Sequence, residues 1–267
     1  MAENKVKIDL CPTRIRIKIL DYARLSREGH VPSSFSIVEI LCAILLHQAG
    51  SYSSFQPKNV VISKGHAAFA YYGFLSELGM LSTDEEASIC QVASPLIGHV
   101  PKVSEDLRFS FGSGSLGHGF PFAVGLAISY WLNGRDERVY CVIGDGEANE
   151  GTFWESLLVM GKFPRIKFTL FVDMNFSSER AIPIVDILRS FVNKIEVKVV
   201  EVDGHLVEEI QSSICKNGSQ IVLCRTVKGF PIEMLGTPSW HHKQIGDLEY
   251  SYLVKELSGA ERICKPI

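Results

Sequence analysis

The sequence has little net charge, no paired cysteine motif and no targeting signal. Its 27 Lys and Arg residues nearly balance 30 Asp and Glu residues, which gives a formal net charge of −3. No dominant basic cluster stands out, and this argues against a nucleic-acid platform. The N-terminus lacks the charged-then-apolar layout of a signal, and no run reaches the eighteen or so apolar residues that span a bilayer. We therefore expect neither a nucleic-acid nor a membrane partner.

The seven cysteines occur without CxxC or CxxH pairing. Several stand inside apolar runs, such as Leu41-Cys42-Ala43 and Tyr140-Cys141-Val142, which favours buried free thiols. Free thiols are typical of a reducing compartment, so a cytoplasmic location is expected. The composition, 46% apolar and 21% charged over 267 residues, is that of an ordinary globular protein. One domain over residues 1–267 is enough to account for it.

Apolar runs of strand length alternate with segments of helical periodicity. The expected strands are 60–62, 139–143, 168–172, 197–202 and 221–225. The expected helices are 11–27, 36–48, 66–78, 116–132, 152–163, 184–192 and 206–215. This alternation predicts an α/β fold with a doubly wound, mostly parallel sheet and helices on both faces. A long loop from about Val92 to Phe111 leads into a glycine cluster, and loops of that length are usually functional.

Two neighbouring predicted strands end in oxygen-bearing side chains. One is followed by Gly144-Asp145-Gly146, and the next ends in Asp173-Met174-Asn175. The carboxyl ends of parallel strands share one edge of a sheet, and Mg²⁺ on a phosphate takes only a few oxygen ligands from protein. Asp145 and Asn175, with a backbone carbonyl at Ser177, are therefore candidate ligands of an ion bound to a diphosphate. The alternative is an ordinary turn in which the aspartate caps a helix.

With these residues the chain resembles the thiamine diphosphate enzymes, and within them the transketolases. The family's cofactor motif opens with Gly-Asp-Gly and closes with Asn, as Gly144 and Asn175 do here. Other segments match in order along the chain. They are Gly29-His30, Ser63-Lys64-Gly65-His66-Ala67, Gly98-His99, Gly114-Ser115-Leu116-Gly117-His118-Gly119, Val202-Asp203-Gly204-His205 and Trp240-His241-His242-Lys243. The resemblance implies the thiamine diphosphate-binding fold.

The resemblance also implies roles for residues that match the family motifs. His66 and His241 match residues that contact the diphosphate and thiazolium side of the cofactor. His30 and His99 match residues that line the substrate channel and handle hydroxyl protons of the ketose donor. Glu150 matches a carboxylate at the subunit interface, near the glutamate that activates the cofactor. These are the candidate catalytic residues.

A second set of positions is implied in cofactor binding, with backbone contacts to the aminopyrimidine among them. It comprises His66, Gly114, Ser115, Leu116, Gly144, Asp145, Gly146, Glu147, Asn175 and His241. The implied cofactors are thiamine diphosphate and Mg²⁺, with Ca²⁺ or Mn²⁺ as alternatives to the latter.

The implied function is the diphosphate- and metal-binding subunit of a heteromeric transketolase, which transfers a two-carbon ketol unit from a ketose to an aldehyde. The chain ends at Ile267 without a pyrimidine-binding domain, so we expect that domain on a second subunit, in an α2β2 assembly. The substrate would be a sugar or sugar phosphate. The stretch after Asn175 lacks the Asp-Gly pair common in relatives, which leaves substrate specificity less defined than the cofactor.

Several other functions stay open. The Gly-Asp-Gly motif is shared by the α subunits of 2-oxo acid dehydrogenases and by acyloin-forming enzymes. A non-catalytic subunit could bind the cofactor only to regulate a partner. The run Gly112 to Gly117 also fits the dinucleotide-binding pattern, although that pattern needs a strand immediately before it and an acidic residue at the end of the next strand.

Overall fold

The computed structural model describes residues 10–48, 54–101, 108–175, 184–195 and 197–260. The chain divides into two compact units that each combine distant parts of the sequence. Unit 1 takes in Met1–Gln56, His66–Gly98 and Val227–Ile267, and unit 2 takes in Pro57–Gly65 and His99–Thr226. The expectation of a single domain over residues 1–267 stays a prediction.

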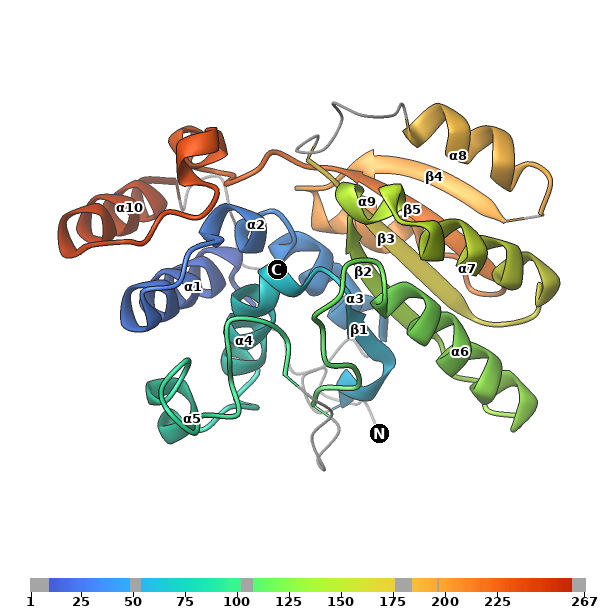
Figure 1. Cartoon of the computed structure of the whole chain (residues 1–267), viewed down its shortest axis with the longest axis horizontal. Helices are drawn as coiled ribbons and strands as arrows, with labels where there is room; N and C mark the ends of the chain where they lie inside the picture. Colours follow the sequence, from blue (N-terminus) through green and yellow to red (C-terminus); the bar gives the residue numbers. More distant parts are fainter. Residues whose placement is uncertain (1–9, 49–53, 102–107, 176–183, 196, 261–267) are drawn as a thin grey trace, which may run out of the picture. The chain divides into compact units, whose positions relative to one another are not determined.

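Unit 2 contains a five-stranded sheet in which every pairing is parallel (Figure 1). The strands are β1 (Val60–Ile62), β2 (Val139–Gly144), β3 (Phe168–Met174), β4 (Lys198–Asp203) and β5 (Ser219–Arg225). Their order across the sheet is β1-β2-β3-β5-β4. The predicted α/β fold with a parallel sheet is therefore confirmed.

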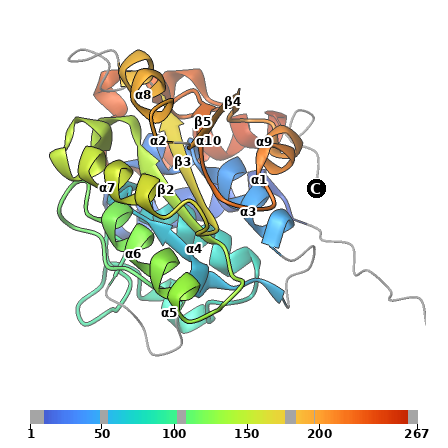
Figure 2. The same ribbon diagram turned by 90° about the vertical axis from the view of Figure 1, so that its right-hand side faces the viewer.

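Helices connect the strands of unit 2 and lie on both faces of the sheet. They are α6 (Gly119–Leu132), α7 (Gly151–Lys162), α8 (Ile184–Val192) and α9 (Val207–Ser213). Right-handed crossovers place α7 and α8 on one face, whereas α9, which returns from β4 to the inner strand β5, must lie on the other. Figure 2 shows this arrangement, with α6, α7 and α8 on one side of the strands and α9 on the opposite side.

The core of unit 2 lies between its central strands and the inner faces of α6 and α7. Strands β2 and β3 are buried along their whole length, as expected where helices cover both faces. Phe120, Phe153 and Phe168 pack together in this core, with ring centroids 5.5 and 5.9 Å from that of Phe120. In the register of β2 and β3, Gly144 lies opposite Asp173. The polar residues that follow the two strands therefore leave the core at the same edge of the sheet.

Unit 1 is helical among its described residues. Its helices are α1 (Pro12–Ser26), α2 (Val31–Phe35), α3 (Val38–Gln48), α4 (Ala68–Glu77), α5 (Thr83–Ala87) and α10 (Asp247–Ala260), and α1 packs against α2, α3, α4 and α10. A buried ion pair between Arg16 and Glu39, with an N–O distance of 2.8 Å, joins α1 to α3. Arg16 also donates to the carbonyl of Phe35 at 3.1 Å, so the buried cation has two partners.

One stretch of unit 1 has the length and composition of a membrane span. Residues Val31–Gln48 reach a mean hydropathy of 1.5 over 18 residues, although no such run was expected from the sequence. In the structure 83% of this stretch is buried among other residues. The core helices of globular proteins meet the same criterion, so the stretch is explained by its packing in unit 1.

Candidate functional site

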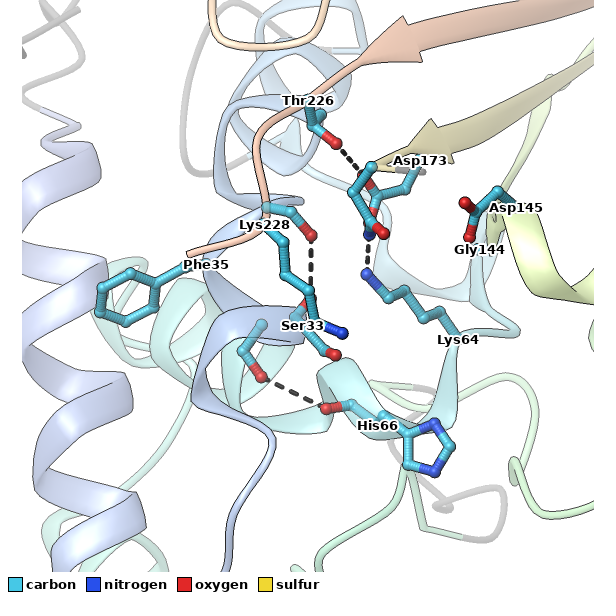
Figure 3. Close-up of polar contacts among 12 residues, drawn as sticks. Ser33, Phe35, Lys64, His66, Gly144, Asp145, Asp173, Thr226 and Lys228 are labelled. Carbon is cyan, nitrogen blue, oxygen red and sulfur yellow. Dashed lines mark hydrogen bonds and ion pairs between the residues drawn. The ribbon is translucent and has the colours of Figure 1, made fainter. Parts of the chain in front are cut away.

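The carboxyl edge of the sheet in unit 2 gathers polar side chains from successive strands (Figure 3). Asp145 follows β2 at the first position of the 3₁₀ helix η4 (Asp145–Asn149), and only 6% of it is exposed. Its Oδ1 accepts a hydrogen bond from the amide of Gly146 at 2.8 Å. The buried carboxylate is thus anchored by its own turn at the edge where a ligand would bind.

A second carboxylate organises this edge. Asp173, near the end of β3, is fully buried and forms an ion pair with Lys64, which follows β1. The hydroxyl of Thr226, just after β5, donates to the other oxygen of Asp173. The side-chain amide of Asn175 donates to Asp173 Oδ2 at 2.9 Å. Figure 3 shows Lys64 and Thr226 reaching the Asp173 carboxylate from opposite sides.

We refer to Lys64, Asp145, Asp173, Asn175 and Thr226 as the edge cluster. Its donor set suits a hard divalent cation on a phosphate, because it offers a carboxylate and an amide oxygen beside a lysine. The hydrogen bond from Asn175 Nδ2 to Asp173 fixes which way the amide faces, and so orients its oxygen. Within the described ranges, no group of three or more His, Cys, Asp or Glu side chains could hold a metal ion alone. The third predicted ligand, Ser177, lies outside the described residues.

Glu147 lies behind the edge cluster and joins three segments of unit 2. Its carboxylate accepts hydrogen bonds from the hydroxyl of Ser63, the amide of Gly144 at 2.9 Å and the amide of Gly117 at 3.2 Å. Burial raises the pKa of Glu147 above its usual value, although these hydrogen bonds act in the opposite direction. Both oxygens therefore bind donors within the protein, and Glu147 holds together the turns that carry other predicted cofactor ligands.

The turn from Gly114 to Gly117, before α6, includes a glycine whose backbone lies close to neighbouring side chains. Gly117 has a φ of +77°, and a Cβ there would lie 2.8 Å from Thr152 Oγ1 and 2.9 Å from Glu150 Cβ. Gly114 is exposed, and a Cβ there would meet nothing within 4 Å. Ser115 and Leu116 are exposed as well. The predicted aminopyrimidine-contacting turn is thus open on one side and packed against Glu150 on the other.

His99, a predicted substrate-channel residue, belongs to unit 2. A Cβ on Gly65 would lie 2.6 Å from the His99 ring and 2.7 Å from Ser113 Oγ. Only glycine at position 65 allows the imidazole to lie this close to the backbone that follows β1.

The other predicted catalytic histidines gather in unit 1. The ring centroid of His30 lies 4.3 Å from that of His66, 5.5 Å from that of His241 and 4.4 Å from that of His242. We call these four residues the histidine cluster. His30 adopts a left-handed conformation with a φ of 67° between α1 and α2. Non-glycine residues in that conformation are uncommon and concentrate at functional sites.

The backbone around the histidine cluster explains how it forms. His241 and His242 follow the 3₁₀ helix η6 (Pro238–Trp240). Gly29 lies against the backbone of His242, where a Cβ would approach the carbonyl carbon to 2.7 Å. Sequence analysis predicted His30, His66 and His241 as site residues, and the structure brings these three together. Their individual roles stay predictions.

Five residues that belong to these clusters or contact them were not predicted as functional. They are Lys64, Asp173, Thr226 and His242, together with Lys228, which contacts His241. The signal for Lys64 and Asp173 was present, because a charged residue at the end of a fully apolar strand needs a partner. Lys228 gave no such signal, since its contact with His241 joins residues 13 apart through a turn.

Comparison with known proteins defines the family. The chain matches the family described as transketolase, thiamine diphosphate binding domain, over residues 9–261, and it belongs to that family. It is 30% identical over 246 residues to one subunit of the apulose-4-phosphate transketolase of Actinobacillus succinogenes, which covers 86% of this chain and 87% of that protein. It is 28% identical over 250 residues to the 6-deoxy-6-sulfo-D-fructose transketolase subunit SqwG of a Clostridium species, with 86% and 88% covered.

Longer transketolases match over part of their length. The mouse enzyme is 29% identical over 258 residues, which cover 91% of this chain and 41% of the mouse protein. The chain thus spans about two fifths of that relative. Among solved structures, transketolase from Leishmania mexicana superposes with a TM-score of 0.77 at 20% identity, over 92% of this chain and 40% of the other. This likeness supports the fold assignment.

Proposed function

We propose that this chain is the thiamine diphosphate- and Mg²⁺-binding subunit of a heteromeric transketolase. The observation that carries the proposal is the edge cluster, in which Asp145 and the oriented amide of Asn175 follow adjacent parallel strands. A hard cation with these two oxygen ligands keeps coordination positions for diphosphate oxygens and water. The near full-length likeness to proteins named as single subunits of transketolases supports the same conclusion.

The proposal gives each cluster a task. Asp145 and Asn175 would hold the metal, and Lys64 adds positive charge at the same edge. The exposed turn at Gly114 to Leu116 would present its backbone to the aminopyrimidine, while Glu147 keeps that turn and the Gly144 turn in place. When bound, thiamine diphosphate supplies the nucleophilic carbon and the electron sink that cleavage of a ketose requires. The histidine cluster would donate to anionic oxygens and move hydroxyl protons of the donor sugar.

A second subunit is part of the proposal. It would carry the pyrimidine-binding domain and the activating glutamate, in an α2β2 assembly. The names of the two bacterial relatives support a divided enzyme, and they include a phosphorylated and a sulfonated sugar. We therefore propose a sugar or sugar phosphate as the substrate here. A 2-oxo acid or acyloin-forming reaction is the alternative, and the histidine cluster favours the hydroxyl-rich ketose.

The test is reconstitution. The chain is purified alone and together with a candidate partner that contains a pyrimidine-binding domain, and each sample receives Mg²⁺, thiamine diphosphate and a ketose donor with an aldehyde acceptor. We expect ketol transfer only from the combined sample. Full activity of the isolated chain would contradict the divided enzyme, and turnover of a 2-oxo acid instead of the ketose would favour the alternative.

A cytosolic location is also proposed. Its support is that the cysteines in the described part of the chain are free thiols, namely Cys11, Cys42, Cys90, Cys141, Cys215 and Cys224. Fractionation of the source cells with an antibody to the chain tests it, and recovery with a secreted or membrane fraction would contradict it.

A further inference from the structure

A buried arginine lies at the amino edge of the sheet in unit 2, where the strands begin, and forms no ion pair with any described residue. Arg138 stands directly before β2 and is only 7% exposed. Its Nη1 donates to the carbonyl oxygens of Phe168 and Gly218, at 3.0 and 3.2 Å, and to Thr169 Oγ1 at 3.0 Å. The guanidinium therefore joins β2, β3 and the turn before β5 through neutral acceptors, at the end of the sheet opposite the edge cluster.

The acidic residues closest to this arginine in the chain are paired with other cations. Asp136 forms an ion pair with Lys167 at 2.5 Å. Glu137 forms an ion pair with Arg135. A buried cation without a counter-charge is costly, and charged side chains are rarely buried in proteins unless they are paired. The guanidinium of Arg138 therefore needs a negative charge that neither carboxylate supplies.

The two weakly acidic groups near the guanidinium are neutral. Nη2 of Arg138 lies 3.8 Å from the sulfur of Cys215, but that sulfur donates its hydrogen to the carbonyl of Asn217 at 3.1 Å and is therefore a thiol. Burial raises the pKa of the Tyr140 phenol to about 12, although the charge of Arg138 acts in the opposite direction. The phenol is thus uncharged near neutral pH, and neither group balances the arginine.

A second unsatisfied group lies beside the arginine. Gln220 on β5 is completely buried and lies opposite Thr169 in the register of β3 and β5. Its Oε1 accepts a hydrogen bond from the amide of Cys215 at 2.9 Å, whereas its Nε2 has no partner in the described part of the chain. Arg138 and Gln220 therefore flank the same two residues, Thr169 and Cys215. A buried donor of this kind is usually satisfied by an ordered water or ion.

We infer that the amino edge of the sheet binds a small inorganic anion, chloride or an ion of similar size, between the guanidinium of Arg138 and the side-chain amide of Gln220. The anion supplies the missing negative charge and accepts from Nε2, whereas a water molecule would satisfy only the amide. Because Thr169 and Gln220 are completely buried, a ligand that reaches both must be small. The ion would stabilise the strands that carry the edge cluster at their other end, independently of the proposed function.

Thermal unfolding of the complete chain tests the site without cofactor or partner. Sodium gluconate, whose anion is too large for the site, is replaced stepwise by sodium chloride at constant ionic strength, so that general screening by salt stays the same. An ion that binds only the folded protein raises the melting temperature, by about 5–10 °C at about 100 times its dissociation constant for a chain of this size. We expect such a rise with chloride and with bromide. A melting temperature that does not depend on the anion would overturn the inference.

Substitutions at Gln220 locate the ion. Gln220→Glu keeps the acceptor for the amide of Cys215 and places a carboxylate beside Arg138, where the anion is proposed to bind. We expect the melting temperature of this variant to be independent of chloride, and in gluconate to be at least that of the wild type. Gln220→Met lacks the donor and should need about tenfold more chloride for the same rise, the effect of one hydrogen bond to a charged group. Undiminished chloride dependence in either folded variant would place the ion elsewhere and overturn the site.

Two arginines provide a matched comparison. Arg138→Met removes the charge at the site and should abolish the chloride dependence, whereas Arg135→Met removes an exposed arginine of the same segment and should keep it. Equal loss in the two variants would mean that chloride acts on surface charge in general, and the inference would fail. If Arg138→Met does not fold, anomalous diffraction from wild-type crystals grown with bromide decides. A bromide peak in contact with Arg138 and Gln220 supports the site, and peaks only elsewhere overturn it.

Discussion

The side-chain amide of Asn175 donates a hydrogen bond to Oδ2 of Asp173 across 2.9 Å, and the same oxygen pairs with Lys64. One fully buried carboxylate therefore sets the orientation of a proposed metal ligand and the position of a cation. Partners of this kind commonly tune a metal site as strongly as some of its ligands. The proposed site consequently depends on residues that need not touch the cofactor.

The ion pair between Lys64 and Asp173 predicts a non-additive loss of stability. Removing one member leaves the other charge largely buried, so Lys64→Met and Asp173→Asn should each lower the free energy of unfolding by about 3–5 kcal/mol. The double variant should lose clearly less than the sum of the two, since no unpaired charge remains. Urea unfolding of the wild type, the two single variants and the double variant measures each free energy of unfolding. If the two single losses simply add up in the double variant, the pair is not coupled.

The proposed metal ligand predicts a loss of affinity with little loss of stability. Asp145→Asn keeps the size of the side chain and its acceptor for Gly146, but removes the charge beside the metal. Loss of a supporting partner typically weakens metal binding about 10–100-fold, so loss of a ligand charge should reach at least that range. Calorimetry of the assembled enzyme with Mg²⁺ and thiamine diphosphate measures it. Asp203→Asn, at the end of β4, is the matched control and should bind normally.

The glycine turn supplies a paired prediction about stability and binding. Gly117→Ala forces a side chain into a left-handed backbone against Thr152 and Glu150, and should cost about 1–3 kcal/mol of unfolding free energy. Gly114→Ala meets no neighbour and should change stability by no more than about 0.5 kcal/mol. If the exposed backbone at Gly114 contacts the cofactor, the same change should still weaken its binding. Equal melting temperatures for the two variants would contradict the first expectation.

The sequence predicted the strands well because buried parallel strands are continuous apolar runs. The strand predicted from the sequence ended at Val172, whereas β3 continues through Asp173 and Met174. A charged residue argues against a buried strand, and only the tertiary partners Lys64 and Thr226 make it acceptable. No local pattern could supply these partners, since they come from the ends of other strands.

Helix boundaries and short helices were predicted less accurately, for local reasons. The helix expected from Leu116 begins at Gly119, because Gly117 is left-handed. Helix α10 was not predicted, as most of its residues are polar and its buried anchors are few, chiefly Leu253 and Leu257. Three members of the histidine cluster, His30, His66 and His241, were predicted as site residues from separate family motifs. Its assembly depends on the turn at Gly29 and on η6, which spacing alone does not reveal.

Glu147 predicts how stability varies with pH. Burial raises the pKa of this carboxyl in the folded state, so the folded protein holds the proton more tightly than the unfolded chain does. The resulting contribution to stability is fully present below the unfolded pKa, about 4.3, and is lost as the pH rises through the higher folded pKa. The Glu147→Gln side chain cannot ionise, so the stability of that variant does not fall in this way as the pH rises. The variant should be less stable than the wild type by about 1–3 kcal/mol in acid, because one buried donor loses its acceptor.

The deficit of Glu147→Gln should therefore shrink as the pH rises towards neutrality. Urea unfolding at a series of pH values measures the difference between the two proteins, and a difference that stays constant would show that the carboxyl titrates normally. Ser63→Ala provides a second check, because the Ser63 hydroxyl stabilises the charged form of Glu147. Its loss should raise the folded-state pKa of Glu147 further, so the upper end of the stability loss moves to higher pH while its onset stays at the unfolded pKa. A shift to lower pH would mean that the hydroxyl instead stabilises the protonated form.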